Sequence, residues 1–494
     1  MRRGIFSSLL VGVCCFLLVL GGCGSGEDAG GKSLRVGTEP AYPPMEFQGQ
    51  KGELQGFSID LMNAVGSAAG FKVNFQSVPF DGLISALQAR TIDAAISSMT
   101  ITKERAQAVS FSRPYFKSGL AIAIRTNNQD ITSFDKLNNQ RVAVQIGTTG
   151  AAKAKEAKGA QIRTFDSTPL ALQELANGNV DAMIGDAPVI AYAINSGNLQ
   201  GIKTVQELLT EEYYGIPTPK DSTNLKLINQ GLTKIFNNGT YAQIYQKWFK
   251  TTPPKLPESL DLIPQADSSP NSITVLIQAF PLLLQGALIT LQLTIFSVFL
   301  GLIVGSLIGI ARLSHFTPLG WAARAYIDFF RGTPLLVQLF MIYYGIPAVV
   351  QNLGLDFSFN RFAAAVVALS LNSAAYIAEI VRAGIQSIEI GQSEAAKSLG
   401  FDAVQTMCYV IFPQAFRRML PPLGNEFISM LKDTSLVAVI SFDELFRKGQ
   451  LIVAQNYRPF EIYAGVAIIY LCLTLLSSQM FSRLETWMNP VKQK

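Results

Sequence analysis

The stretch AISSMTITKERAQAVSFSRPY, residues 95–115, gathers several hydroxyls and an arginine, Arg105, within a short length of chain. The planar guanidinium of an arginine can bond both oxygens of a carboxylate, and hydroxyls or helix N-terminal amides can share that load. A site for an amino acid needs such a fixed cation, an acidic acceptor for the ammonium and a shaped wall. The stretch therefore offers part of a binding site for a small zwitterion in compact form.

Histidine and cysteine chemistry has little support in this chain of 494 residues. The single histidine, His315, argues against a histidine-based catalytic site or a zinc cage, so we expect no metal site. None of the five cysteines lies between residues 32 and 262, so this part has no disulfide. Cys408 and Cys472 lie in the apolar C-terminal half and are expected to be inert packing residues. The net charge of +5 is spread out without a basic block, which argues against nucleic-acid binding.

The composition indicates a chain that lies partly in a bilayer. Hydrophobic residues make up 49% of the chain, charged residues 15%, and the mean hydropathy is +0.27. A membrane-spanning helix needs about 20 apolar residues. Charge-free runs cover residues 268–311, 332–355, 362–378 and 462–482. A weaker candidate, residues 427–445, contains Lys432, Asp433 and Asp443, so we expect about five helices in an all-α polytopic domain.

The N-terminal residues 1–23, MRRGIFSSLLVGVCCFLLVLGGC, have the pattern of a secretory signal. The run LGGC at its end resembles a bacterial lipobox, which predicts lipidation of Cys23; the alternative is an uncleaved signal anchor. Either interpretation exports the residues that follow. Residues 24–33 are rich in glycine and are expected to form a flexible tether.

Short apolar runs alternate with amphipathic stretches over residues 34–250, which predicts an α/β domain with mostly parallel sheets. Residues 251–272 are rich in proline and serine and are expected to form a linker. If the exported domain leads into the first span, most Lys and Arg of the C-terminal half fall in cytoplasmic loops, as the positive-inside rule expects. Residues 386–416 then face the cytoplasm.

Within that loop a short helix precedes Gly400, which permits a sharp turn at a helix C-terminus. The apolar run 404–412 is too short to span a bilayer, and we expect Pro413 to end it. Such a loop suits docking on another protein, although a merely structural loop is the alternative. No GxxxxGK[ST] phosphate loop occurs in the sequence, so ATP and Mg would be used by a separate subunit, and this chain needs no cofactor of its own.

The loop resembles the EAA loop of ABC-importer permeases, the segment that inserts into the ATPase subunit. The residues that match are Glu394, Ala395, Ala396, Gly400 and Pro413. FFRGTPLLVQLF (329–340) and NEFISMLKDTSL (425–436) are similar to the polar amino-acid permeases. The resemblance implies a permease domain over residues 273–488, coupled to a separate ABC ATPase. It implies a permease homodimer as the simplest assembly, with pairing to a second permease chain as the alternative.

Residues 34–250 resemble the family-3 solute-binding proteins, through the 95–115 stretch, TEPAYPPMEF (38–47), GFSIDL (56–61) and NGTYAQIYQKWF (238–249). The resemblance implies a two-lobed periplasmic-binding-protein fold of type II that closes on its ligand like a hinge. Lobe one would comprise residues 34–123 and 218–250, and lobe two residues 125–214. Together the two resemblances imply an inner-membrane protein whose binding domain lies on the periplasmic side.

The same resemblance implies a role for each residue of the ligand site. Arg105 would hold the α-carboxylate, assisted by Thr100, Thr148 and Thr149, and Asp186 would take the α-ammonium. Tyr42 and Phe80 would sandwich the side chain, and Ser98 would contribute a hydroxyl or backbone contact. The alternatives are a surface role for the arginine, a helix N-cap for the aspartate and core packing for the two aromatic residues.

Glu39 lies where the basic-amino-acid binders of the family place an aspartate facing the cationic end of the ligand. Ser97 and Ser98 also resemble the basic-ligand subgroup, and Gln145 would widen the tolerance. We therefore expect basic amino acids with glutamine as a second ligand; the alternative is glutamine or glutamate only. A ligand-gated channel or an exported enzyme on the same binding fold are the alternatives in other classes. Every predicted span follows the complete binding domain and no TVGYG-like filter occurs, which argues against the channel, and the attached permease argues against the enzyme.

Overall fold

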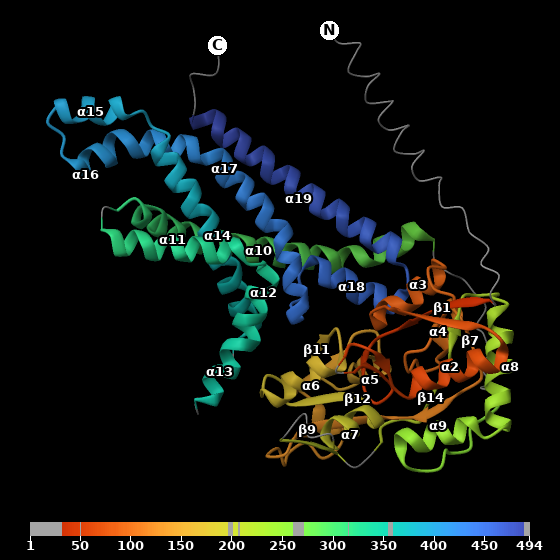
Figure 1. Cartoon of the computed structure of the whole chain (residues 1–494). Coiled ribbons are helices and arrows are strands. Elements are labelled where there is room, and N and C mark those ends of the chain that lie inside the picture. Colours follow the sequence, from red (N-terminus) through yellow and green to blue (C-terminus); the bar gives the residue numbers. More distant parts are fainter. Residues whose placement is uncertain are drawn as a thin grey trace, which may run out of the picture.

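The computed structural model describes residues 32–49, 51–195, 201–205, 208–259, 271–314, 316–353 and 359–488. The predicted signal segment with Cys23, nearly all of the tether, His315 and the second half of the linker lie outside the described residues. The described chain forms an α/β part, coloured red to green in Figure 1, beside a helical part coloured green to blue. This is the α/β binding-protein fold followed by a helical region that the sequence predicts.

The first lobe is built on a parallel sheet in which β1 (Ser33–Thr38) lies between β5 (Lys72–Ser77) and β6 (Ala94–Ala95). Strand β1 alternates exposed and buried residues at its start, and Leu34 and Val36 enter the core, as the two-residue period of a strand requires. A small antiparallel sheet joins the first lobe. It consists of β2 (Ala41–Tyr42), β3 (Glu46–Gln48) and β4 (Leu54–Gln55).

Helices cover this lobe and complete its core. The predicted helical run at residues 224–249 divides into α8 (Asn224–Asn237) and α9 (Thr240–Phe249), because Gly239 between them adopts a φ of 80°. Both helices pack with α2 (Phe57–Ala69) around one apolar cluster. The smaller helices are η1 (Phe80–Gly82), α3 (Leu83–Gln88) and α4 (Lys103–Ala108).

The second lobe is built on a five-stranded sheet of order β11-β10-β12-β9-β13. Its central strands are buried almost throughout because apolar clusters lie on both faces of the sheet. The strands are β9 (Leu120–Arg125), β10 (Arg141–Gln145), β11 (Gln161–Phe165), β12 (Ala182–Asp186) and β13 (Ile202–Thr204). The helices are η2 (Phe134–Leu137), α5 (Thr149–Ala154), α6 (Thr168–Ala176) and α7 (Ala187–Asn195).

The crossing between the lobes lies earlier than the sequence predicts. Strand β9 pairs with β12 and β13 in the second sheet, so it belongs to lobe two and not to a first lobe that ends at residue 123. The crossing itself is β8 (Phe116–Ser118), which pairs with the returning β14 (Glu212–Tyr214). Beside it β7 (Ser110–Phe111) pairs with β15 (Pro217–Thr218). Sequence composition could not separate β8 from β9, because only the pairing partners distinguish them.

Three helices in the described residues are long and apolar enough to span a membrane: α10 (Ser272–Arg312), α14 (Arg361–Gln386) and α19 (Pro459–Met488). A fourth candidate is a pair bent by 105°, formed by α11 (Thr317–Gly332) and the helical segment 335–350. That segment begins with α12 (Leu335–Phe340), continues through the π-helical Met341–Gly345 and runs into α13 (Ile346–Asn352).

The weakest predicted span, residues 427–445, is not one continuous α-helix. Helix α17 (Phe412–Asp433) ends within it and a 3₁₀ segment, Thr434–Ile440, follows. Helix α18 (Leu445–Asn456) begins at the end of this region. Lys432 and Asp433, which lower the hydropathy of this predicted span, lie at the end of α17, and Asp443 lies just before α18.

Three glycines of α10, Gly301, Gly305 and Gly309, face α14. A Cβ added at Gly305 would lie 2.6 Å from the carbonyl oxygen of Ala374, and one at Gly309 would lie 2.8 Å from that of Ala378. The four-residue spacing therefore forms one smooth face that lets two spanning helices approach closely. Close packing of α10 and α14 is therefore the structural role of these glycines.

The loop around Gly400 differs from its prediction at one point. Helix α15 (Ile390–Ser398) ends before Gly400, whose φ of 87° makes the expected sharp turn. Pro413, however, does not end the next helix. The chain runs through α16 (Ala403–Gln405) and a π-helical segment, Thr406–Ile411, into α17. Proline lacks a backbone N–H, and it is accommodated here in the first turn of α17 directly after the wider π turn.

The two cysteines of the C-terminal half are not packed inside the protein. Both Cys408, in the π-helical segment, and Cys472, in α19, are free and exposed on the chain. The expectation of buried packing residues is therefore wrong for both. An apolar sequence context does not distinguish a protein interior from a surface that faces lipid or a partner.

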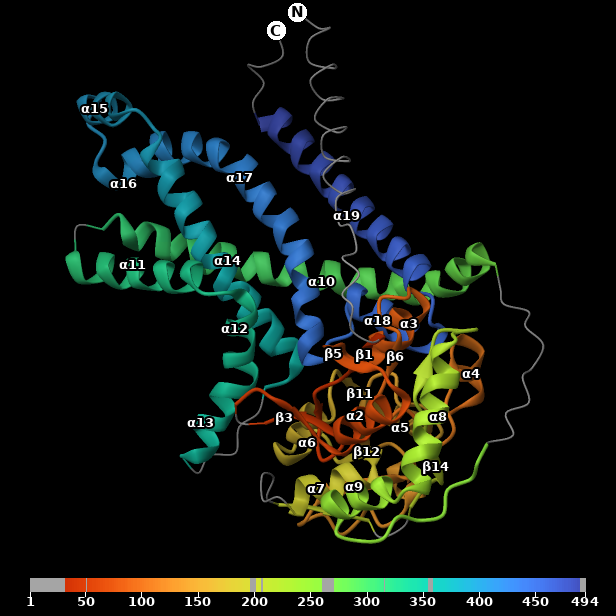
Figure 2. The same ribbon diagram turned by 45° about the vertical axis from the view of Figure 1, so that its right-hand side comes forward.

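The two parts of the chain meet at one end of the helical region. Figure 2 shows α18 beside the first lobe, close to α3, whereas α15 and α16 lie at the far end of the helical region. The predicted ligand site and the predicted docking loop are therefore on opposite sides of the helices.

Candidate ligand-binding site

One pocket between the two lobes brings together all of the predicted ligand-site residues. Lobe one supplies them from the loop after β1, from η1 and from the 95–115 stretch, whereas lobe two supplies them from the ends of β10 and β12. The lining residues are Glu39, Tyr42, Phe80, Ser97, Ser98, Thr100, Arg105, Gln145, Thr148, Thr149 and Asp186. Ser97 is the addition to the predicted set. The ends of strands in an open α/β sheet are where such folds bind ligands.

Three hydrogen bonds connect the lobes across this pocket. The Nε2 of Gln145 donates to Oε2 of Glu39 at 2.7 Å. The hydroxyl of Tyr42 donates to Oδ2 of Asp186 at 2.6 Å. The guanidinium of Arg105 donates to the carbonyl oxygen of Gly147 at 2.9 Å. Since each bond joins one lobe to the other, the lobes are held together in a closed arrangement.

Arg105 is a buried cation, with 4% of its surface exposed. Its helix α4 is capped by Thr102, whose side chain accepts a hydrogen bond from the Arg105 backbone N–H. The guanidinium also donates to the carbonyl oxygen of Thr100 at 2.7 Å and lies 5.3 Å from the centre of the Phe80 ring. These contacts exclude the surface-arginine alternative and point the planar fork into the pocket.

Asp186 ends strand β12 and is also buried. Besides Tyr42, the hydroxyl of Tyr214 donates a hydrogen bond to the same carboxylate oxygen. Burial raises the pKa of Asp186 to about 6, and the nearby Glu212 adds to this, while the two tyrosine hydroxyls oppose it. A carboxylate held by two phenols in a dry site is a strong acceptor for an ammonium group.

Glu39 is a buried carboxyl group in the pocket wall. Burial raises its pKa to about 8, against the opposing effect of the hydrogen bond from Gln145. The charges of Asp81 and Asp166 add to the increase. The amide oxygen of the same Gln145 side chain, Oε1, accepts a hydrogen bond from the Thr168 hydroxyl at 2.8 Å, which fixes the orientation of the amide. A neighbouring cation would therefore restore the ionised form of Glu39.

Four residues in or near the pocket were not among the predicted site residues. Ser97 accepts a bond from the Glu39 backbone N–H at 3.0 Å, and Tyr214 holds Asp186. Glu46 is fully buried and accepts from the Ser98 hydroxyl at 3.2 Å, and burial raises its pKa well above the ordinary value. The fourth is Glu212. It was predicted to lie within lobe two, close to its end at residue 214, and the structure places it on β14.

Glu212 joins the hydroxyls of the carboxylate-binding side into one network. Its Oε2 accepts from Thr100 at 2.7 Å and from Thr149 at 2.9 Å, one residue from each lobe. Thr148 caps α5 by accepting from the Ala151 backbone N–H. Two of the three hydroxyls predicted to assist Arg105, those of Thr100 and Thr149, are therefore oriented by a buried glutamate on β14, whereas the Thr148 hydroxyl donates to the carbonyl oxygen of Gln145.

The pocket and its immediate surroundings contain more acids than bases. The buried carboxyl groups are Glu39, Glu46, Asp186 and Glu212. Arg105 is the cation among the residues that line the pocket. An amino acid brings one carboxylate and one ammonium, so a neutral side chain leaves this excess in place. A ligand with a second positive charge would favour the ionised form of one of these carboxyl groups and pair with it.

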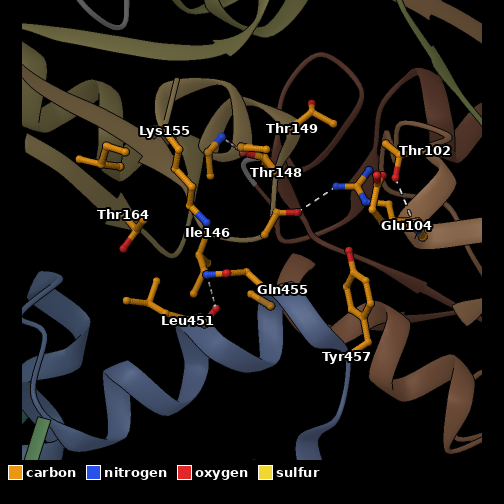
Figure 3. Close-up of a pocket in the computed structure, with 16 residues that line it drawn as sticks. Thr102, Glu104, Ile146, Thr148, Thr149, Lys155, Thr164, Leu451, Gln455 and Tyr457 are labelled. Carbon is orange, nitrogen blue, oxygen red and sulfur yellow. Dashed lines mark hydrogen bonds between the residues drawn. The ribbon is translucent and has the colours of Figure 1, made fainter. Parts of the chain in front are cut away.

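A second cavity of about 340 Å³ adjoins the ligand pocket and shares Arg105, Thr148 and Thr149 with it. Figure 3 shows that α18 of the helical part forms one side of this cavity. That side consists of Leu451, Ala454, Gln455 and Tyr457. The cavity therefore lies between the ligand pocket and the membrane domain.

The predicted docking residues lie on the opposite side of the helical part. Glu394, Ala395 and Ala396 belong to α15, and the glycine turn separates that helix from α16. Large apolar side chains are exposed around this turn: Ile390, Leu399, Val404, Tyr409 and Phe412. Exposed apolar side chains gathered around one turn suit a protein partner.

Comparison with known proteins assigns the two parts of the chain to different protein families. Residues 34–251 match the bacterial extracellular solute-binding proteins of family 3. Residues 297–490 match the inner membrane components of binding-protein-dependent transport systems.

Curated relatives match the membrane part over nearly their whole length. The glutamine transport system permease protein GlnP of Escherichia coli K12 is 45% identical over 215 residues, which is 43% of this chain and 94% of that protein. The arginine transport system permease protein ArtQ of Bacillus subtilis 168 is 40% identical over 200 residues, which is 40% of this chain and 89% of that protein. A solved structure of an ancestral arginine-binding protein is 41% identical, with a TM-score of 0.43, over 44% of this chain and 98% of its own.

Proposed function

Because the chain belongs to the family of amino acid ABC importers, with a solute-binding domain fused ahead of its permease domain, we propose that it takes up basic amino acids. Glutamine is the proposed second ligand. The observation that carries this choice is the excess of buried carboxyl groups over cations around the ligand pocket. Two permease relatives, named for glutamine and arginine transport, support the same pair of ligands.

In this proposal each pocket residue keeps its predicted role. Arg105, with Thr100, Thr148 and Thr149, binds the α-carboxylate, and Asp186 accepts from the α-ammonium. Their positions in the one pocket support this assignment. Glu39 pairs with the cationic end of the side chain, which Tyr42 and Phe80 enclose. For glutamine, the amide NH₂ donates to Glu39 in place of the cation, a weaker bond than a charge-assisted one.

The proposed assembly places the binding domain on the periplasmic side and the α15–α16 turn in the cytoplasm. The opposite positions of these two parts on the helices support this orientation. The exposed apolar residues around Gly400 dock in a groove of a separate ABC ATPase, which binds ATP and Mg and hydrolyses the nucleotide. Two copies of the chain with two ATPases form the transporter, and this chain is a receptor and pore rather than an enzyme.

Calorimetry on the full chain in lipid nanodiscs, against all common amino acids, tests the proposed ligand. We expect arginine and lysine to bind most tightly, glutamine more weakly, and Glu39→Gln to weaken the basic ligands selectively. Binding of glutamine or glutamate alone would refute the role of Glu39 and favour the alternative ligand. If no amino acid binds, the proposed function is wrong.

A further inference from the structure

Helix α18 of the permease contacts both lobes of the binding domain at once. It is fixed within the membrane domain by Glu444, its N-cap, which accepts from the backbone N–H groups of Phe446 and Arg447. The same carboxylate accepts from the Tyr470 hydroxyl of α19 at 2.9 Å. Thr290 of α10 accepts from the backbone N–H of Leu445 at 3.1 Å. Two spanning helices therefore determine where α18 lies.

The contact with lobe two is made by Arg447, whose side chain is fully buried. Its guanidinium forms an ion pair with Asp166 and donates to the carbonyl oxygen of Thr164 at 2.7 Å. Asp166 lies next to the ligand pocket, because its own carbonyl oxygen accepts from Nε2 of Gln145 at 3.3 Å. That same nitrogen donates to Glu39. Arg447 of the permease is thus connected to Glu39, the predicted contact of the ligand side chain, through Asp166 and Gln145.

The contact with lobe one is made at the other end of α18. Tyr457 packs against the apolar cluster of α3, and Phe80 of the ligand pocket packs against the same cluster. Between the two ends, Gly147 of lobe two lies where all three parts meet. A Cβ built on Gly147 would lie 3.5 Å from Asp81 of lobe one and 3.7 Å from Ala454 of α18.

From these contacts we infer that α18 stabilises the closed arrangement of the lobes by binding both of them, with Arg447 on lobe two and Tyr457 on lobe one. A rigid helix can hold two separate surfaces only when they lie at the spacing that the helix presents. The cross-lobe bonds set that spacing in the closed arrangement. A hinge motion that separates the lobes must break one of the two contacts.

The consequence is a reciprocal coupling between the ligand and the permease. Contacts that exist only when the lobes are closed favour that state, and a state that the ligand also favours is then populated more readily. By linkage, the intact permease domain must raise the affinity for the ligand by the same factor by which the ligand strengthens the contact with α18. Arg447 and Tyr457 are positioning residues in this scheme and do not touch the ligand.

This inference rests on the proposed function, since it needs an amino acid that closes the lobes. The test measures the equilibrium constant and the dissociation rate of radiolabelled arginine on the full chain in nanodiscs. The variants are Arg447→Gln and Tyr457→Asn, singly and together. Asparagine is chosen because Tyr457 has a φ of 55°, a conformation that asparagine tolerates. The control is Arg458→Gln, which removes an arginine paired with Glu461 of α19.

We expect each single variant to weaken arginine binding by roughly 5- to 150-fold, the range that couplings between sites usually cover. The loss should appear as faster dissociation, because the contacts act after the lobes have closed. The affinity of the double variant for arginine should equal that of the more strongly affected single variant. Losing either contact already frees one lobe, so losing the second adds nothing. The control should bind like the wild type.

Dissociation rates within twofold of the wild type in both single variants would overturn the inference, and so would fully additive losses. If Arg447→Gln fails to fold, Asp166→Asn tests the same ion pair from its partly exposed side, where 43% of the aspartate side chain is accessible. A wild-type chain that binds no amino acid would instead refute the proposed function, which keeps the two failures distinct.

Discussion

The pKa of Glu39 leads to a quantitative prediction for the binding of basic amino acids. Burial raises this pKa to about 8. At pH 6.5 only about 3% of such a group is ionised, and at pH 8.5 about three quarters is. A cationic side chain binds the carboxylate form. The affinity for arginine should therefore rise with pH, by roughly 25-fold across this window, and level off above pH 8.

Two controls follow from the same geometry. Glu39→Gln should remove the rise, because glutamine has no proton to lose, and it should leave a weaker, nearly constant affinity. Free glutamine should show a smaller rise with the wild type, since its neutral amide does not require an ionised partner. Asp186, with a pKa of about 6, should change the affinity mainly below pH 6.5.

Calorimetry in buffers with different ionisation enthalpies measures both the affinity for arginine and the number of protons released on binding. Near pH 7 each arginine bound should release close to one proton, because Glu39 ionises as the ligand enters. An affinity for arginine that is constant from pH 6.5 to 8.5, or that falls with pH, would refute the pairing of Glu39 with the cationic end. So would proton release that persists unchanged in Glu39→Gln.

Three further predictions test other parts of the chain. Arg105→Ala should weaken amino-acid binding by at least about 100-fold, because charge-assisted bonds contribute about 1.5–3 kcal/mol each; calorimetry that finds an affinity within threefold of the wild type would contradict this. Gly400→Asp should abolish ligand-stimulated ATP hydrolysis by the co-purified ATPase while ligand binding persists, because Gly400 has a φ of 87° at the proposed docking turn; normal stimulation would disprove the docking role. Gly305→Ala should destabilise the chain by about 1–3 kcal/mol in thermal unfolding, since its Cβ would lie 2.6 Å from the carbonyl oxygen of Ala374. Gly391→Ala, where an added Cβ meets nothing within 4 Å, is the matched control, and an equal loss in both would argue against close packing.

The residues of the candidate pocket and the class of the protein were predicted from the resemblance of short stretches to known families, whereas the elements that carry them follow from local patterns. Alternating strands and helices follow from the spacing of apolar residues, and charge-free runs mark spanning helices. Arg105 and its neighbouring hydroxyls lie within one short stretch. Gly400 follows a helix and takes the positive φ that glycine allows. Each of these features depends on residues that are close together in the sequence.

Other features depend on contacts between distant parts of the chain. The pairing of β9 with β12 and β13 decides which lobe contains it, and no local pattern records that pairing. The raised pKa values of Glu39 and Asp186 arise from burial between two lobes, which exists only in the folded protein. Glu212 became part of the surroundings of the pocket only because two threonines from different lobes donate to its carboxylate.

Arg447 illustrates this difference most clearly. In the sequence it is one arginine after a poorly defined apolar run, and its partner Asp166 lies 281 residues earlier. Only the packing of α18 against the binding domain brings the two together and buries the guanidinium. The sequence by itself therefore determined which elements form and which chemistry they carry. The tertiary structure decided which of those groups lose their water and meet, and their charges act strongly only after that loss.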